Sequence, residues 1–442
     1  MSHRQPLPAF QVLAHHPAVQ ALLAAAAAEG VPCHLVGGAL RDRLLGLSSY
    51  DLDAVVAGHG REIAAAVAAA VAARFVALGG KEFAAYRLVG RDFVLDLWDR
   101  GEMSLYDDLA RRDFTVNSFA YSPREEMISD PFSGLADLGR RVLRATTGAS
   151  FTGDPLRVLR LPRLSLQLPG FAAGPATLAL ARASAPGVAL VAAERVRDEL
   201  ERIFAHEEAH RGLALLATLD LYPGLWLGRP GEPGPAGDAG GDGTPGAIRE
   251  IEALPGCIRA LRELSAEAAE AVDTRAARDI RFASLFAHLP GEPGLLLERF
   301  RDAGYLSPKT ATRVAALLAT PDLPGMPGSS GDGLDRRRFL HQAGPDWPAA
   351  VCHLGVRAVA RGEEPAWRQA LGPLVQLALA EGAAIVDPPR LLSGAEVQEI
   401  LGIPPGPEVG RALATLRAAQ VDGTVRTREQ AIARLNRHAT DR

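Results

Sequence analysis

The run LVGGALRDRLLG (35–46) combines an apolar segment, two glycines and a basic segment that favours helix. An apolar strand that meets Gly37 and Gly38 and then a helix lets backbone N–H groups approach a phosphate closely. The positive end of the helix dipole and Arg41 would add favourable potential. An ordinary Gly-Gly turn would produce the same letters, so the run is one half of a candidate anion site.

Three aspartates supply the other half. Asp51 and Asp53 lie two apart on an expected extended segment, so their side chains point the same way and can share metal ions. Oxygen-only ligation suits Mg²⁺, which usually keeps waters and substrate phosphates as its remaining ligands. Asp96 interrupts the apolar segment Val94–Trp98, where a buried carboxylate is costly unless it is paired or binds a metal. The alternatives are a solvated acidic loop and a strand residue that faces water.

The segment DLARRDFTVN (108–117) is the third candidate. Two adjacent arginines, an aspartate and an asparagine could clamp a charged ligand that bears hydroxyl groups, although a surface helix with ion pairs would contain the same residues. Asn117 is one of only two asparagines in the chain, the other being Asn436, so composition does not explain its presence.

Composition limits the class of protein. With 52 acidic and 48 basic side chains, the formal charge of −4 shows no basic excess, so any RNA site must be a local patch. The three cysteines form no CxxC pair, which disfavours a disulfide framework and predicts that the protein works in a reducing compartment of the cell. No uninterrupted apolar stretch reaches the ~18 residues that span a bilayer. We therefore expect a cytoplasmic protein with no membrane partner.

The elements that must position these residues form a mixed α/β region followed by helices. Alanine-rich segments at 11–29 and 61–73 predict helices. The predicted strands are Cys33–Val36, Arg74–Leu78, Phe83–Leu88 and Phe93–Trp98, the last two joined by a hairpin turn at Val89–Asp92. From about residue 154 strand signals fade, and Ala192–Phe204 has helical spacing. Residues 228–246 contain no large side chain and predict a flexible insertion, and Pro321–Arg337 is a second break.

Five motifs in this order resemble the class II tRNA nucleotidyltransferases and bacterial poly(A) polymerases, a branch of the polymerase-β-like superfamily. The motifs are LVGGALRD followed by LLG and DLD, DLARRDFTVNSFA, DPFSGLADLGRRVLRAT and DPLRVLRLPR, with LLSGAEVQEILGIPPGPEVGRAL (391–413) in the C-terminal region. The resemblance covers residues 30–222 in recognisable order. It implies an α+β fold: a mixed-sheet nucleotidyltransferase head followed by an all-α neck, body and tail.

The resemblance also implies domain boundaries and partners. The head would be residues 1–148, the neck 149–227, the insertion 228–246, the body 247–375 and the tRNA-binding tail 376–442. The implied reaction is template-independent transfer of C and/or A from CTP and/or ATP to the tRNA 3′ end, with two Mg²⁺ ions.

What the resemblance implies for single residues follows from the matched motifs. Gly37, Gly38 and Arg41 would hold the triphosphate, Asp51 and Asp53 the two metal ions, and Asp96 would be the third catalytic carboxylate. Arg112 would contact phosphate, and Asp113 and Asn117 the ribose. Asp154 and Arg157 would read the base, with Arg160 also binding the nucleotide. Glu194 and Arg195, in ERVRDEL, would support the base-reading pair from the neck.

The sequence departs from the family pattern at three places. Gly153 replaces the glutamate that usually precedes Asp154. Only ten residues, 101–110, separate Arg100 from Arg111, where CCA-adding members carry a longer flexible loop, and this resembles the CC-adding members. In 282–292 (FASLFAHLPGE), a region where some members carry an HD phosphohydrolase motif, the aspartate after His288 is missing.

One motif competes with this interpretation. His206-Glu-Glu-Ala-His210 matches the HExxH zinc-protease pattern, whose histidines share one helix face, but a solvated helix end is the favoured interpretation.

The functional alternatives stay open at this point. They are a poly(A) polymerase, a non-catalytic RNA-binding relative, and a metal-dependent hydrolase in the helical half. Clustered carboxylates repel phosphate and have no use in a pure RNA binder, which favours the enzyme.

Overall fold

The computed structural model describes residues 2–3, 8–47, 51–78, 84–221, 244–289 and 291–440. The chain divides into two compact units: unit 1 is Met1–Val191 with Thr218–Leu225, and unit 2 is Ala192–Ala217 with Trp226–Arg442. Each unit has its own core and is described by itself.

Unit 1 is built on an eight-stranded mixed sheet with the order β1-β8-β7-β2-β3-β6-β5-β4. β3 and β6 are parallel, whereas β2–β3, β6–β5 and β5–β4 are antiparallel pairs. The strands are β1 (Ser2–His3), β2 (Cys33–Val36), β3 (Asp51–Val56), β4 (Arg74–Leu78), β5 (Ala84–Val89), β6 (Val94–Asp99), β7 (Ala120–Ser122) and β8 (Met127–Ser129). The predicted mixed-sheet head is confirmed, and the four predicted strands end within one residue of the observed ones.

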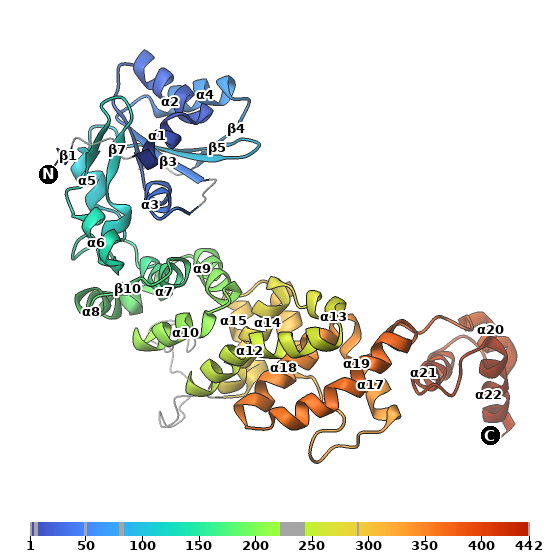
Figure 1. Ribbon diagram of the computed structural model, residues 1–442. Coiled ribbons are helices and arrows are strands. Elements are labelled where there is room, and N and C mark those ends of the chain that lie inside the picture. The colour runs from blue at the N-terminus through green and yellow to red at the C-terminus, as the bar shows by residue number, and fades with distance from the viewer. Residues whose placement is uncertain are drawn as a thin grey trace. The chain divides into compact units, whose positions relative to one another are not determined.

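Two helices cover one face of this sheet, α2 (Pro17–Ala28) and α4 (Gly60–Ala70) (Figure 1). Their buried side chains, among them Leu22 and Val67, pack with Leu95 of β6 into one apolar core. The predicted single helix 11–29 is wrong: α1 (Pro8–Ala14) ends before α2 begins. Proline is favoured in the first turn of a helix, where its missing N–H costs nothing, so Pro17 starts a new helix.

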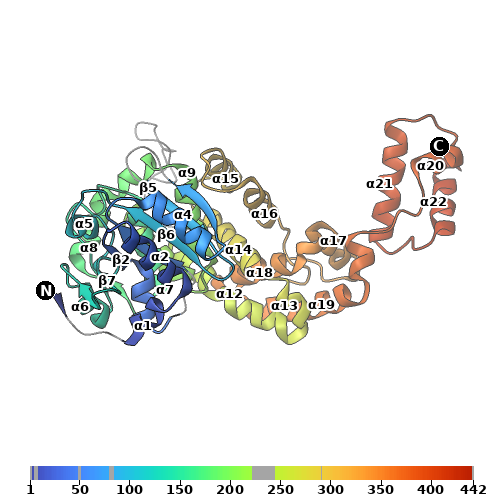
Figure 2. The ribbon, with the colours of Figure 1, turned by 90° about the horizontal axis from the view of Figure 1, so that it is seen from above.

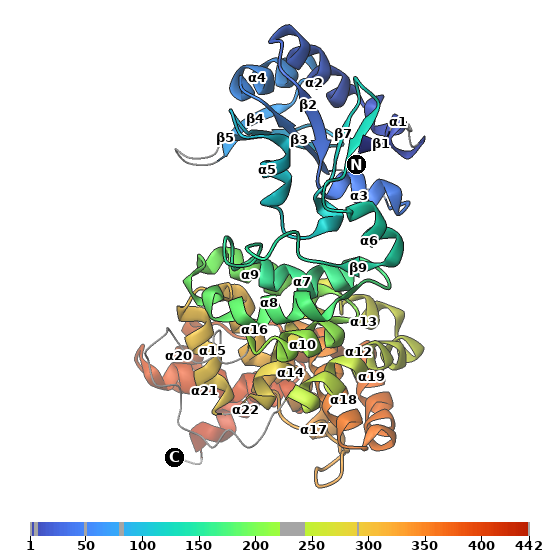
Figure 3. The same ribbon diagram turned by 90° about the vertical axis from the view of Figure 1, so that its left-hand side faces the viewer.

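α5 (Leu105–Ala110) lies on the opposite side of the sheet from α2 and α4 (Figure 3). Its Leu109 packs with Val36 and Val55 in a small second core. Because side chains alternate along a strand, these residues mark the sheet face that also carries Asp51, Asp53 and Asp96.

Unit 1 is completed by short elements after the sheet. They are α3 (Gly38–Leu44), the 3₁₀ turn η1 (Thr115–Asn117), α6 (Gly134–Arg140), β9 (Val142–Leu143), α7 (Arg157–Gln167), β10 (Ala172–Ala173), α8 (Pro175–Ser184) and η2 (Ala185–Leu190). The compact units therefore part at residues 191 and 192, inside the segment 149–227 that the sequence assigns to the neck.

Unit 2 is entirely helical in its described residues, as the sequence predicts. Its elements are α9 (Ala193–Ala205), α10 (Ala209–Thr218), α12 (Thr244–Leu264), α13 (Ala266–Glu270), α14 (Thr274–His288), α15 (Pro293–Asp302), α16 (Pro308–Leu318), α17 (Gly333–Ala343), η3 (Gly344–Asp346), α18 (Trp347–Ala360), α19 (Glu364–Val386), α20 (Gly394–Leu401), α21 (Pro407–Val421) and α22 (Arg428–Thr440). The predicted insertion at 228–246 lies largely outside the described residues. Its last three residues belong to α12.

The last three helices, α20 to α22, pack on one another around their own apolar cluster (Figure 2). α20 begins with a capping box in which Ser393 and Glu396 satisfy each other's backbone N–H groups. Arg337 of α17 donates to the carbonyl oxygen of Val421 at 2.6 Å, and Arg338 forms a bidentate pair with Asp422 at 3.1 Å. These bonds join the predicted tail to the body within unit 2.

Among the described residues, α19 is the one helix long and apolar enough to cross a bilayer. Trp367, Leu371 and Leu374 on this helix are buried within unit 2, and α19 contacts α17 and α18. It is interpreted as a helix that packs one face within unit 2, since 28% of its apolar window is buried.

Candidate active site

The turn between β2 and α3 places backbone and carboxylate in direct contact. Gly37 has φ +76°, and a Cβ at this position would lie 2.5 Å from Oδ2 of Asp53. Only glycine fits both the backbone conformation and the contact. The backbone N–H of Gly38 donates a hydrogen bond to Asp53. The guanidinium of Arg41 folds back over the turn, where a Cβ on Gly38 would lie 3.2 Å from its Nη2. The predicted phosphate turn therefore exists, with a buried arginine beside it.

Strand register brings the third carboxylate to the first two. Asp53 on β3 lies opposite Asp96 on β6, and Asp51 lies one same-face position earlier, opposite Val94. The three aspartates thus share one sheet face. Asp96 is also opposite Arg87 of β5, and the two side chains form a bidentate ion pair with distances of 2.8 and 2.7 Å. The alternative interpretation of Asp96, a strand carboxylate that only faces water, is wrong because the side chain is paired with Arg87.

Asp53 has the most perturbed environment of the three. Burial raises the pKa of Asp53 to about 6; Arg112 acts in the opposite direction, and the neighbouring Asp96 and Asp51 raise the pKa further. A desolvated carboxylate among like charges is stabilised by a bound cation, and the donors are oxygens only. Asp51 and Asp53 therefore fit a divalent metal ion. No three His, Cys, Asp or Glu side chains converge on one point in the described ranges, and Asp96 is held by Arg87.

A chain of hydrogen bonds links the turn to α7. Nη1 of Arg41 donates to Oδ1 of Asn117 at 2.6 Å, and the Asn117 amide donates to Oδ1 of Asp113 at 2.9 Å. Asp113 is 6% exposed and also pairs with Arg160 at 3.4 Å. Burial alone would raise the pKa of Asp113, but Arg160 and the bonds from Asn117 and the Phe114 N–H outweigh it, so the pKa lies below the usual value. Residues 113–117 are thus an internal network and not a surface helix. Asp108, however, lies on α5 and pairs with Arg112, as the alternative of a helix with ion pairs predicts for the start of the segment.

The proposed base-reading pair is close in space. Nε of Arg157 lies 4.0 Å from Oδ2 of Asp154, which precedes the first turn of α7. Arg157 also donates to the backbone oxygen of Ser150 at 2.9 Å. Burial lowers the pKa of Arg157 despite the nearby Asp113 and Asp154. A desolvated guanidinium next to a carboxylate can present one donor and one acceptor to a ligand. Arg112, also predicted for the site, pairs with Asp108 of α5 at 3.0 Å.

Glu194 and Arg195 fall in unit 2, on the first turn of α9. The Glu194 side chain is 79% exposed and lies 3.9 Å from Arg197. Their role as supports of the base-reading pair stays a prediction.

The HExxH motif does not form a zinc site. His206 follows the last residue of α9, whereas His210 lies within α10, so the two histidines do not share a helix face. Nδ1 of His206 accepts a bond from the backbone of Glu208. The solvated helix end is the better interpretation.

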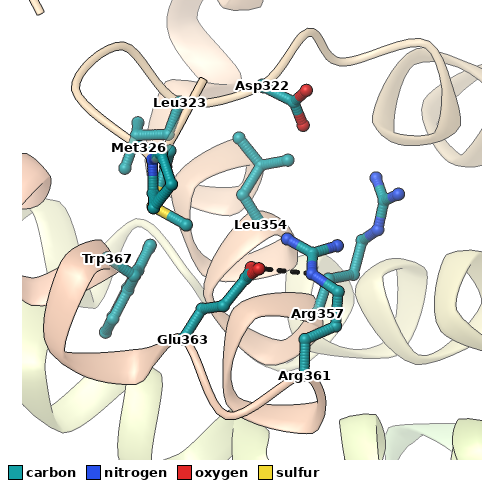
Figure 4. Close-up of a pocket in the computed structure, with 9 residues that line it drawn as sticks. Asp322, Leu323, Met326, Leu354, Arg357, Arg361, Glu363 and Trp367 are labelled. Atoms are coloured by element: carbon teal, nitrogen blue, oxygen red, sulfur yellow. Dashed lines mark hydrogen bonds and ion pairs between the residues drawn. The ribbon is translucent and has the colours of Figure 1, made fainter. Parts of the chain in front are cut away.

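The HD-like segment contains no metal cluster in its described part. His288 at the end of α14 binds Glu250 of α12 through Nε2 at 2.9 Å, and a Cβ on Gly246 would lie 2.5 Å from its ring. His288 is therefore a packing residue between two helices. A cavity of about 270 Å³ also lies in unit 2, where Arg361 pairs with Glu363 near Trp367 (Figure 4). It contains no predicted site residue.

Sequence reasoning missed Arg87, which holds Asp96 across two strands. The signal was weak because a lone arginine on a strand resembles any solvated residue; only the β5–β6 register reveals the pair.

Comparison with known proteins shows the family of the chain. Residues 33–144 match the model of the poly A polymerase head domain, and residues 170–226 match a model described as a probable RNA and SrmB-binding site of polymerase A. A CC-adding tRNA nucleotidyltransferase of Geobacter sulfurreducens is 31% identical over 91% of both chains. The chain belongs to the class II tRNA nucleotidyltransferases.

Other tRNA nucleotidyltransferases show how far the similarity extends. An A-adding member from Deinococcus radiodurans is 32% identical over 92% of this chain and 95% of its own. The crystal structure of the Bacillus stearothermophilus CCA-adding enzyme in complex with CTP has a TM-score of 0.71 and 25% identity, and covers 98% of each chain. The chain is thus a tRNA nucleotidyltransferase, which excludes the non-catalytic binder and the hydrolase, and relatives of similar identity differ in the nucleotide they are named for.

Proposed function

We propose that this enzyme adds two cytidines to the tRNA 3′ end and stops before the terminal adenosine. The observation that carries the proposal is the short connection between β6 and α5. Gly101–Ser104 form a turn, with Arg100 bonded to the Met103 carbonyl, and Ser104 caps α5 by accepting from the Asp107 N–H. Leu109 of the same segment is buried. No length remains for a mobile loop that would help the site change from CTP to ATP.

Primer extension tests this proposal. tRNAs that end before C74, C75 or A76 would be incubated with CTP, ATP, UTP or GTP separately. We expect two CMP additions and almost no AMP. Efficient joining of AMP to a tRNA that ends in CC would contradict CC addition and favour a CCA-adding or A-adding enzyme. Repeated AMP addition to unrelated RNA would favour a poly(A) polymerase.

The nucleotide would lie between the turn and the network that ends at Arg160. The N–H of Gly37 and the guanidinium of Arg41 would hold the triphosphate, and Arg112 would contact a phosphate. Gly38, whose N–H is bonded to Asp53, would complete the turn around it. Asn117 would face the ribose, held from behind by Asp113, whose two oxygens are already bonded. Asp154 and Arg157 would bind the base edge.

Members of the family use a divalent metal ion. We propose that the metal is Mg²⁺, that two ions bind, and that Asp51 and Asp53 hold them. When bound, such ions favour the ionised attacking hydroxyl and neutralise the leaving pyrophosphate. The 3′-hydroxyl would lose its proton to solvent, and its oxygen would form a bond to the α-phosphorus while the bond to the bridging oxygen breaks and pyrophosphate leaves. Asp96 would lie next to the attacking hydroxyl.

The helical region would bind the tRNA backbone through phosphate contacts. The sequence suggests five arginines for these contacts: Arg275, Arg278, Arg281, Arg299 and Arg301. Arg281 is unsuited to the role because it is 3% exposed and donates to the Phe204 carbonyl at 2.9 Å. Arg299 is exposed on α15. We place the enzyme in the cytoplasm, where its tRNA substrate would be.

A further inference from the structure

The order of groups across the sheet predicts the side from which the RNA end arrives. On the site face, strand register aligns Val36, Asp53, Asp96 and Arg87 in one row from β2 to β5. On the proposed function, the leaving pyrophosphate lies at the turn that follows Val36. Because nucleotidyl transfer is an in-line displacement, the attacking 3′-hydroxyl must come from the opposite side. The primer therefore lies over β6 and β5.

An exposed tryptophan occupies that side. Trp98 is the next same-face residue after Asp96 on β6, about 7 Å along the strand. Its residue surface is 44% exposed, although Leu95 and Leu97 on the other face of the same strand are fully buried. Trp98 has Val55 on one side, which α5 covers, and Ala85 of β5 on the other. The cover that α5 gives to this face of the sheet therefore ends at Trp98.

The surroundings of Trp98 suit a nucleotide. Ala85 is small, 5% exposed and opposite Trp98, and Leu78 of β4, 37% exposed, lies next in the same row. The neighbouring row on the same face is the one that contains Asp53, Asp96 and Arg87. The charge of Arg87 partly neutralises Asp96, where an RNA phosphate would approach the aspartates. An apolar, aromatic surface beside a neutralised carboxylate can accept a base and its ribose.

We propose that Trp98 stacks on the base of the 3′-terminal nucleotide of the primer RNA and so holds its hydroxyl near Asp96. Base–aromatic stacking tolerates any sequence, since every base has a π-face. That tolerance suits a site where the terminal base changes after each addition. The inference rests on the proposed nucleotide addition but does not depend on whether CC or CCA is made.

Steady-state kinetics on the full-length enzyme test the proposal. Trp98→Ala should raise the KM for tRNA by about 5- to 150-fold, the range expected for one stacked base. The KM for CTP should stay near the wild-type value. Trp98→Phe should restore most of the loss because phenylalanine keeps a stacking ring. The matched control is Tyr106→Ala, which removes a 57% exposed aromatic residue of α5 whose ring packs on Phe132.

A primer that lacks only its 3′-terminal base isolates the stacking contact. For the wild-type enzyme, the KM for the abasic primer should exceed the KM for the normal primer by about the factor that Trp98→Ala causes with the normal primer. With the abasic primer, Trp98→Ala should raise the KM no further, so that the two losses do not add. An unchanged KM for the abasic primer, or fully additive losses, would overturn the subsite. A wild-type enzyme that extends no tRNA would instead contradict the proposed function, so the two failures are distinguishable.

Discussion

At the scale of single residues, Asp53 shows how function opposes stability. Its carboxylate packs against Gly37, accepts a bond from Gly38 and lies near Asp51 and Asp96. Partial desolvation of this negative charge destabilises the folded protein, and a bound metal ion would remove that destabilisation.

Asp53→Asn should therefore abolish activity yet stabilise the metal-free protein. The pKa of Asp53 is about 6 in the folded state against an ordinary 3.8, so the folded state binds more protons between these values and stability falls as pH rises. The variant should gain about 1–3 kcal/mol in free energy of unfolding at pH 8, and roughly half of that at pH 5. Urea unfolding in EDTA measures this, with Asp220→Asn, an exposed carboxylate, as control. A variant less stable at pH 8 would contradict the account.

Asp154→Ala tests base selection at the same scale. Cytosine and adenine present an amino donor beside a ring-nitrogen acceptor, which a carboxylate and a guanidinium match, whereas uracil and guanine reverse that order. Losing the contact should reduce the preference for CTP over UTP by roughly 10- to 100-fold, by analogy with bidentate readout of bases at ~1–3 kcal/mol. Competition assays measure the ratio. Asp220→Ala removes the partner of Arg182 on the surface of the same unit and serves as control. Undiminished rejection of UTP would exclude the pair as the base reader.

At the scale of elements, the β2–α3 turn couples two strands and a helix through one glycine. β2 and β3 are hydrogen-bonded neighbours, so the turn that ends β2 lies over Asp53 of β3. The packing leaves no room for a side chain at Gly37, whereas Gly46, at the other end of α3, has φ +72° with nothing near its missing Cβ.

Gly37→Ala and Gly46→Ala form a matched pair. Both substitutions place alanine at positive φ, which costs about 1 kcal/mol or more of stability. Gly37→Ala alone should also displace Asp53, weakening Mn²⁺ binding in a spin-resonance titration and reducing turnover by at least about tenfold. Equal metal affinity in the two variants would show that the turn does not position the carboxylate.

At the scale of the whole molecule, the charge of −4 makes RNA binding depend on local arginines, many of which serve the fold. Arg278 pairs with Asp279 at 3.0 Å and with Glu201 at 3.4 Å, and Arg281 is buried against α9. Burial lowers the pKa of Arg281 to about 10. Such residues already serve contacts within the fold, so they are poorly placed to neutralise RNA phosphates.

The salt dependence of tRNA affinity should distinguish arginines that contact RNA phosphates from arginines that serve the fold. Arg299→Ala should reduce the slope of log affinity for tRNA against log salt by about one, the effect of losing one phosphate contact. Arg281→Met should lower the melting temperature and leave that slope unchanged. Filter binding at several salt concentrations measures both slopes. A flat wild-type dependence would contradict electrostatic binding altogether.

The sequence alone determined four of the eight strands of the sheet and named the residues of the candidate site. The strands Cys33–Val36 and Arg74–Leu78 agree with the structure because their apolar patterns and flanking glycines are local signals. Gly37, Asp51 and Asp53 lie within 17 residues of one another, so spacing alone could place them together.

Only the tertiary structure decided which distant residues meet. The strand order puts Asp96 beside Asp53 and Arg87 beside Asp96, and the fold joins Arg41 to Asn117 across 76 residues. It also decided that Arg281 is buried and that Trp98 is exposed. Register and burial depend on how strands and helices pack, and a local pattern of residue types contains no information about the partner on the next strand.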